Sequence, residues 1–150
     1  MPDWKTLYPF ESKFLEIPKS ETSAEKVRLH YVEQGPGRRQ SGASEGLEQQ
    51  ADAAALPTIL CVHGNPTWSF TYREILQQLS GEARVVAVDH IGCGLSDKPQ
   101  QYPYTLEQHI GNLARLIEQL DLRRITLLVH DWGGAIGLGA ALKLPARFEK

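Results

Sequence analysis

Three short, mostly apolar runs alternate with stretches of helical periodicity, and this alternation constrains the fold more than any other feature. The runs are Thr58-Ile-Leu-Cys-Val62, Arg84-Val-Val-Ala-Val88 and Ile125-Thr-Leu-Leu-Val129. Runs of this kind are typical of strands buried on both faces of a sheet. Apolar residues recur every three or four positions in two helical stretches, Tyr72 to Leu79 and Leu106 to Leu120, and the small, mostly apolar stretch Gly133 to Leu144 predicts a third helix that packs tightly on the sheet. This order favours an α/β fold with a mostly parallel sheet.

The first 34 residues predict an antiparallel strand pair at the start of the chain. Lys13 to Ile17 and Val27 to Val32 alternate partly between apolar and polar residues, and turn-forming residues separate them. Residues 35–56 lack periodicity and predict a flexible insertion at the amino end of the parallel strands. Since 34 residues are too few to form a core alone, residues 1–150 are expected to belong to one core domain.

Charge and composition exclude several classes of protein. Sixteen Lys and Arg against eighteen Asp and Glu give a net charge of −2, which leaves no basic surface for nucleic acid or an anionic membrane. No apolar stretch approaches the roughly 20 residues of a membrane span, and no signal-peptide pattern opens the sequence. Two separated cysteines, Cys61 and Cys93, are too few for a disulfide scaffold. We therefore expect free thiols and a cytoplasmic location.

In a parallel sheet, functional residues lie in the loops past the carboxyl ends of the strands. Three loops of this sequence have that place, and they begin at His63, Asp89 and His130. Of these, His130 to Gly134 has the layout of a nucleophile elbow, a tight strand-to-helix turn that exposes one residue. That residue is Asp131, whose carboxylate is ionised at neutral pH and needs no base to act as a nucleophile. The amino end of the following helix would favour its charge. The simpler alternative is that Asp131 only caps the helix.

The loop after the first buried strand supplies hydrogen-bond donors. His63 and Gly64 begin it where an oxyanion-binding loop would lie, and Gly64 allows close backbone approach. Asn65 carries two side-chain N–H donors, and Trp132 carries one. If both side chains face one cavity beside Asp131, they form a fork for a small anion. The alternatives are an ordinary turn at Asn65 and a core aromatic at Trp132.

Three motifs together resemble the haloalkane dehalogenases of the α/β-hydrolase fold. They are His63-Gly-Asn-Pro-Thr-Trp-Ser69, Asp89-His-Ile-Gly-Cys-Gly-Leu-Ser-Asp-Lys-Pro99 and Val129-His-Asp-Trp-Gly-Gly134. The resemblance runs from about Tyr8 to the end, except for residues 35–56, and implies a three-layer α/β-hydrolase core. Asn65 matches the dehalogenases, which use asparagine to bind halide, whereas epoxide hydrolases usually carry an aromatic residue there.

The resemblance implies hydrolysis of haloalkanes to alcohol and halide, with no metal or organic cofactor. Asp131 would attack the carbon that bears the halogen and form an alkyl ester. Asn65 and Trp132 would bind the departing halide, and backbone N–H groups near them would hold the oxyanion during ester hydrolysis. His63 and Gly64 would support this loop. The expected partners are a small halogenated alkane and a halide ion.

The resemblance covers only the amino-terminal half of a dehalogenase, because no histidine follows Asp131 in this sequence. The family's catalytic histidine and helical cap would lie in the other half. Without further strands, Ile125 to Val129 would form an apolar sheet edge open to self-association. We expect His30 and His109 to be structural or solvated. The competing functions are an epoxide hydrolase with the same aspartyl ester chemistry, and a non-catalytic remnant.

Overall fold

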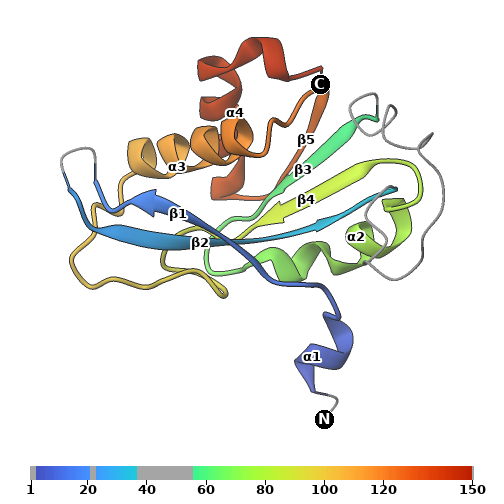
Figure 1. The fold of residues 1–150 in the computed structure, drawn as a ribbon, viewed down its shortest axis with the longest axis horizontal. Helices are drawn as coiled ribbons and strands as arrows, with labels where there is room; N and C mark the ends of the chain where they lie inside the picture. Colours follow the sequence, from blue (N-terminus) through green and yellow to red (C-terminus); the bar gives the residue numbers. More distant parts are fainter. Residues whose placement is uncertain (1–2, 21–22, 37–55, 150) are drawn as a thin grey trace, which may run out of the picture.

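One mixed sheet lies between two layers of helices in the computed structural model, which describes residues 3–20, 23–36 and 56–149 (Figure 1). The elements in chain order are α1 (Trp4–Leu7), β1 (Lys13–Pro18), β2 (Lys26–Gln34), β3 (Thr58–Val62), the 3-10 turn η1 (Ser69–Tyr72), α2 (Arg73–Leu79), β4 (Arg84–Val88), α3 (Leu106–Gln119), β5 (Ile125–Val129), α4 (Trp132–Lys143) and the 3-10 turn η2 (Pro145–Arg147). The predicted α/β class is confirmed.

The strand order β1-β2-β4-β3-β5 brings the ends of the three buried strands to one level. β3 pairs in parallel with both β4 and β5, whereas β1, β2 and β4 pair antiparallel. Val62 at the end of β3 lies opposite Val88 of β4 and Val129 of β5. The loops that follow β3, β4 and β5 therefore leave the sheet side by side, which places the three sequence motifs at one edge.

Two apolar cores cover the two faces of the sheet. Successive strand residues point to opposite faces, so Leu60 and Val62 pack with α3 and α4, and Cys61 packs with α2 on the other side. Figure 1 shows α3 and α4 together on one side of the sheet and α2 on the other. This is the three-layer arrangement that the resemblance implied, and it holds the carboxyl ends of the strands in fixed positions.

The elements differ from the predicted ones mainly at their ends. β2 extends to Gln34 because its last residues pair with β4, where Glu33 binds Lys13 at 3.0 Å and Arg84 at 2.6 Å. The helix predicted from Tyr72 is preceded by η1, so the chain turns earlier than the periodicity indicates. Residues 37–55 of the predicted insertion lie outside the described residues.

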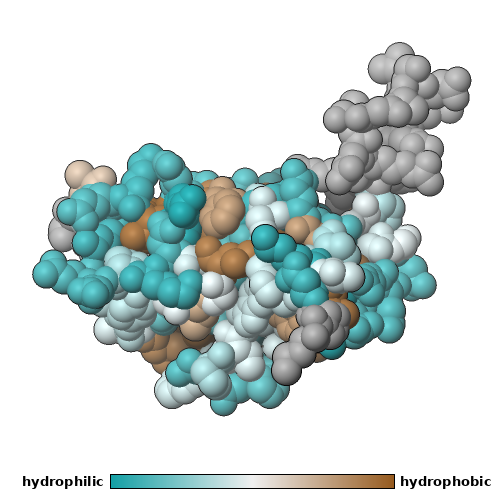
Figure 2. Space-filling model, turned by 90° about the horizontal axis from the view of Figure 1, so that it is seen from below, coloured by the Kyte–Doolittle hydropathy of each residue, from teal (hydrophilic) through white to brown (hydrophobic). Residues whose placement is uncertain are grey.

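β5 is the last strand in the order, and its outer end is apolar. Leu128 and Val129 are each 37% exposed, and on α4 Leu138 and Leu142 are 59% and 84% exposed. The predicted apolar edge is thus present at Leu128 and Val129, whereas Ile125 is buried and pairs with Phe148. Self-association stays a prediction. Figure 2 shows a different arrangement on the face seen from below, where apolar patches are separated by hydrophilic side chains. None of the described helices is long and apolar enough to cross a bilayer.

Candidate active site

The turn between β5 and α4 presents Asp131 to solvent in a sparsely populated backbone conformation. Its φ of 56° and ψ of −130° are unusual for a residue with a side chain. The turn is tight because Gly133 lies against the backbone of β3, where a Cβ atom would overlap the carbonyl oxygen of Val62. Within the described chain, the Asp131 side chain makes no capping hydrogen bond to α4, and its interaction with the helix is with the N–H of Trp132, the residue that follows it. Its geometry is therefore that of an elbow residue rather than of a helix cap.

Two backbone N–H groups hold the Asp131 carboxylate in its charged form. The N–H groups of Trp132 and Asn65 keep its pKa below the ordinary value, and the Asn65 N–H donates to Oδ1 at 3.0 Å. Gly64 makes this approach possible, because a Cβ atom at that position would overlap the Asp131 side chain. The loop after β3 and the elbow after β5 thus meet at one ionised carboxylate.

A cavity of about 440 Å³ lies beside this carboxylate, and both Asn65 and Trp132 line it. Trp132 is 57% exposed, so the alternative of a core aromatic does not hold. The alternative of an ordinary turn at Asn65 does hold, because the Thr67 N–H closes a turn onto the Gly64 carbonyl at 3.2 Å. The turn and the cavity wall are made by the same residues, and apolar and aromatic side chains complete the wall at Ile91, Tyr104, Leu106 and Ile136.

The histidines near the cavity are neutral and largely occupied by hydrogen bonds. His63 bonds to the Gly64 carbonyl at 2.6 Å and to the His90 N–H at 3.0 Å. Burial lowers the pKa of His63, and it lowers the pKa of His90 to about 3. His109 lines the cavity with a buried Nδ1 atom that has no partner among the described residues. The sequence predicts a structural or solvated role for His109, whereas the structure places it in the cavity wall.

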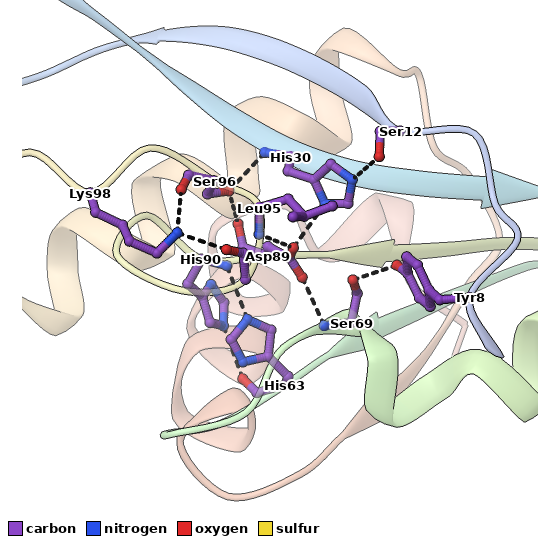
Figure 3. A network of polar contacts seen from close by, with 11 residues as sticks. Tyr8, Ser12, His30, His63, Ser69, Asp89, His90, Leu95, Ser96 and Lys98 are labelled. Atoms are coloured by element: carbon purple, nitrogen blue, oxygen red, sulfur yellow. Dashed lines mark hydrogen bonds and ion pairs between the residues drawn. The ribbon is translucent and has the colours of Figure 1, made fainter. Parts of the chain in front are cut away.

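Asp89, the first residue after β4, is fully buried in a network of donors (Figure 3). Its carboxylate bonds to His30 Nδ1 at 2.8 Å, the Ser69 N–H at 2.7 Å and the Leu95 N–H at 2.8 Å. Burial alone would raise the pKa of Asp89, but these hydrogen bonds outweigh burial and hold it below its ordinary value. The network ties β2, the loop after β3 and the loop after β4 together.

Sequence reasoning missed this network, although one signal for it was present. Gly92 and Gly94 both have positive φ, and a Cβ atom at Gly94 would overlap the Asp89 carboxylate. Two glycines spaced in this way after a buried strand indicate a loop that wraps back on itself. His30 completes the network from the other side through Ser12 Oγ, at 3.0 Å from its Nε2. His30 is therefore structural, as expected.

Cys61 and Cys93 are both free thiols in the described part of the molecule. Burial raises the pKa of Cys61 to about 12 and also raises the pKa of Cys93, so both are thiols at neutral pH. The described residues bring together no three His, Cys, Asp or Glu side chains that could hold a metal ion. The ionised carboxylate of Asp131 is exposed beside the cavity.

Comparisons with known proteins agree with this geometry. The model of the alpha/beta hydrolase fold family matches residues 57–150. The chain belongs to this family. This α/β hydrolase is 38% identical over 148 residues to the cis-3-alkyl-4-alkyloxetan-2-one decarboxylase of Shewanella oneidensis, a match that covers 97% of this chain and 38% of that protein.

Haloalkane dehalogenases are similar in both sequence and structure. The haloalkane dehalogenase of Psychrobacter cryohalolentis is 35% identical over 145 residues, which are 95% of this chain and 42% of that protein. The solved structure of haloalkane dehalogenase DpaA from Paraglaciecola agarilytica superposes with a TM-score of 0.71 at 30% identity, over 97% of this chain and 45% of that one. This α/β hydrolase therefore spans less than half the length of each of these three relatives.

Proposed function

We propose that this chain carries the nucleophile and the leaving-group site of an enzyme that displaces an anion from a saturated carbon. Asp131 is the nucleophile, and Asn65 and Trp132 hold the departing anion. The observation that carries the proposal is the meeting of the two loops. The Asn65 N–H donates to Asp131 Oδ1 at 3.0 Å, while Asn65 and Trp132 line the adjacent cavity. Such an arrangement places donors where negative charge develops.

The first candidate reaction is hydrolytic dehalogenation of a haloalkane in the full protein that contains this sequence. A carboxylate oxygen of Asp131 attacks the carbon, the carbon–halogen bond breaks, and the halide leaves with the electron pair. The product is an alkyl ester on Asp131. Water then cleaves the ester, which returns the carboxylate and releases an alcohol and a proton. The backbone N–H groups of Asn65 and Trp132 stabilise the oxyanion of that second step.

Mass spectrometry tests the first step directly. The protein is incubated with a 1-bromoalkane and quenched within the first turnover, before water cleaves the ester, and we expect one alkyl group on Asp131 for each bromide released. Asp131→Asn should show neither. Asp3→Asn is the matched control, because it makes the same chemical change at an exposed residue outside the site. Alkylation elsewhere that persists in Asp131→Asn would contradict the proposed nucleophile.

The second candidate reaction is decarboxylation of an oxetan-2-one, and the identity to the Shewanella protein over 97% of this chain favours it. Asp131 would attack the saturated ring carbon that is bonded to the ring oxygen. The bond between that carbon and the oxygen would break, and the carboxylate that forms, still attached to the substrate, would face Asn65 and Trp132. Loss of CO₂ would then push its electron pair into a new carbon–carbon double bond and expel the Asp131 carboxylate. This sequence of steps consumes no water.

The products distinguish the candidates. We expect alcohol and halide from a bromoalkane if the first candidate is correct, and alkene and CO₂ from a cis-3,4-dialkyloxetan-2-one if the second is. Gas chromatography measures both in the full protein. A diol formed from an epoxide, with no alkene and no halide, would identify an epoxide hydrolase instead. If no product and no Asp131 adduct forms, the remaining alternative is that the protein is a non-catalytic remnant.

A further inference from the structure

The peptide group between Gly64 and Asn65 is held at both of its ends. Its N–H end is that of Asn65, which donates to Asp131 Oδ1 at 3.0 Å. Its carbonyl end is that of Gly64, which accepts from His63 Nδ1 at 2.6 Å and from Thr67 Oγ1 at 3.2 Å. The C=O and N–H of a planar trans peptide point in opposite directions. Whatever fixes the Gly64 carbonyl therefore also aims the Asn65 N–H.

The contacts of His63 require one tautomer of its ring. A carbonyl oxygen only accepts hydrogen bonds, so the Nδ1 atom facing the Gly64 carbonyl carries the proton. The backbone N–H of His90 donates to Nε2 at 3.0 Å, so Nε2 carries none. The other tautomer would leave two donors facing each other at Nε2 and two acceptors facing each other at Nδ1. His90 thereby selects the form of His63 that can hold the carbonyl.

His63 and His90 bind each other reciprocally in a buried place. The His90 ring donates through Nε2 to the His63 carbonyl at 3.0 Å, and the two ring centroids lie 4.4 Å apart (Figure 3). His63 is fully buried and His90 is 6% exposed. Burial disfavours the charged form of both rings, because it lowers the pKa of each. The neutral tautomer of His63 is therefore maintained at neutral pH.

We infer that His63 is a positioning residue for the nucleophile: with its tautomer selected by His90, it aims the Asn65 N–H at Asp131. The inference rests on the proposed function, in which Asp131 is the nucleophile and the Asn65 N–H stabilises charge beside it. A residue that only filled this space would act through its volume, and either tautomer would serve. A positioning residue acts through the Nδ1 proton, and this difference can be measured.

Two substitutions separate the proton from the volume of the ring. In His63→Asn, the side-chain amide nitrogen can stand at the place of Nδ1 and donate to the Gly64 carbonyl. In His63→Gln, the amide stands at the place of Nε2, so the hydrogen bond from residue 63 to the carbonyl is lost and only the Thr67 donors remain. The readout is the pKa of the Asp131 carboxyl, followed by ¹³C NMR titration. We expect His63→Gln to raise this pKa toward the ordinary value and His63→Asn to leave it low. Equal pKa values in both variants would overturn the inference.

A measurement on the unmodified protein covers the case in which a variant does not fold. Long-range ¹H–¹⁵N correlation spectra identify the protonated ring nitrogen of His63, and we expect protonated Nδ1 and bare Nε2. A protonated Nε2 would overturn the inference without any substitution. The NMR results do not depend on catalysis, whereas alkylation of Asp131 by a 1-bromoalkane does. Failure of the proposed function would therefore appear as absent alkylation with the His63 results intact.

Discussion

β4 and β5 are each followed by an aspartate within two residues of the strand end, Asp89 and Asp131, yet the two carboxylates have opposite environments. Asp89 after β4 is fully buried, and its oxygens face donors from three segments. Asp131 after β5 is exposed, has a positive φ and meets only the backbone donors of Asn65 and Trp132. The same residue type at the same sheet edge therefore serves structure in one place and is available for chemistry in the other.

The difference shows that a lowered carboxyl pKa does not by itself identify a nucleophile. The pKa values of Asp89 and Asp131 both lie below the ordinary value. Access is what separates them, because a substrate carbon can reach the exposed carboxylate and not the buried one. Substitutions at the two aspartates should accordingly affect different properties, the chemistry at Asp131 and the stability at Asp89.

The largest expected effect is on the chemistry at Asp131. Asp131→Asn removes the proposed nucleophile, and loss of a nucleophile lowers turnover by roughly 10⁴-fold or more. The free energy of unfolding should stay within about 0.5 kcal/mol of the unmodified protein, because the side chain is exposed. Turnover of a 1-bromoalkane or an oxetan-2-one and urea unfolding measure the two properties. A loss of unfolding free energy as large as that expected for Asp89→Ala would contradict the contrast between the exposed Asp131 and the buried Asp89.

Asp89→Ala should do the reverse. It leaves His30 and two backbone N–H groups without their buried partner, so we expect a loss of about 3–5 kcal/mol in the free energy of unfolding. Asp97→Ala is the control, because Asp97 pairs with Arg28 at 3.1 Å at the surface and should cost about 1 kcal/mol or less. Urea denaturation followed by circular dichroism measures both. Equal losses in the two variants would show that the Asp89 network contributes no more than a surface ion pair.

Asn65→Ala tests whether the cavity beside Asp131 binds an anion. Loss of one hydrogen bond to a charged group costs roughly 1.5–3 kcal/mol, so halide affinity should fall about tenfold to a hundredfold. Bromide should quench tryptophan fluorescence saturably, because Trp132 lines the same cavity. Quenching of Trp4 and Trp68 by simple collision would be linear in bromide. Saturable quenching that is unchanged in Asn65→Ala would reject the anion site.

The smallest effect expected is on the pH dependence of stability. The pKa of His90 is about 3 in the folded protein and about 6.5 when unfolded. The unfolded chain therefore binds a proton first as pH falls, and stability decreases from pH 6.5 downward by about 1.4 kcal/mol per pH unit for each such proton. The lowered pKa of Asp89 adds its own loss only below about pH 4. Urea unfolding between pH 4.5 and 6, a window chosen on these roughly separated ranges, reports on the buried histidines together, because burial also lowers the pKa values of His63 and His109. His90→Phe should remove the contribution of His90 and make the slope there shallower.

The sheet could be predicted closely because its signals are local. β3, β4 and β5 have the predicted bounds, since each apolar run is limited on both sides by polar or turn residues. The elbow at Asp131 could be predicted because only two residues separate the strand from a helix that has two glycines near its start, which permits few backbone paths. The longer β2 could not, because its last residues are held by pairing with β4 and by the ion pairs of Glu33.

The side-chain networks required the structure. His63 and His90 lie 27 residues apart in the chain, and His30 and Asp89 lie 59 apart. Periodicity indicates which face of an element is buried, but it does not indicate which donor meets which acceptor across loops. The cavity position of His109 escaped prediction for the same reason, because its helix face reads as an ordinary amphipathic surface.

Because Gly133 has no side chain, the turn that carries Asp131 lies directly against the backbone of β3, a contact that does not depend on any β3 side chain. Gly133 rests against the carbonyl of Val62, and the His130 N–H donates to that same oxygen at 3.2 Å. Every amino acid carries this carbonyl, so strand residues can vary while the elbow keeps its distance from the Gly64–Asn65 peptide. The position of Asp131 is thereby fixed by main-chain contacts, and a change of side chain in β3 alters the core without moving the carboxylate.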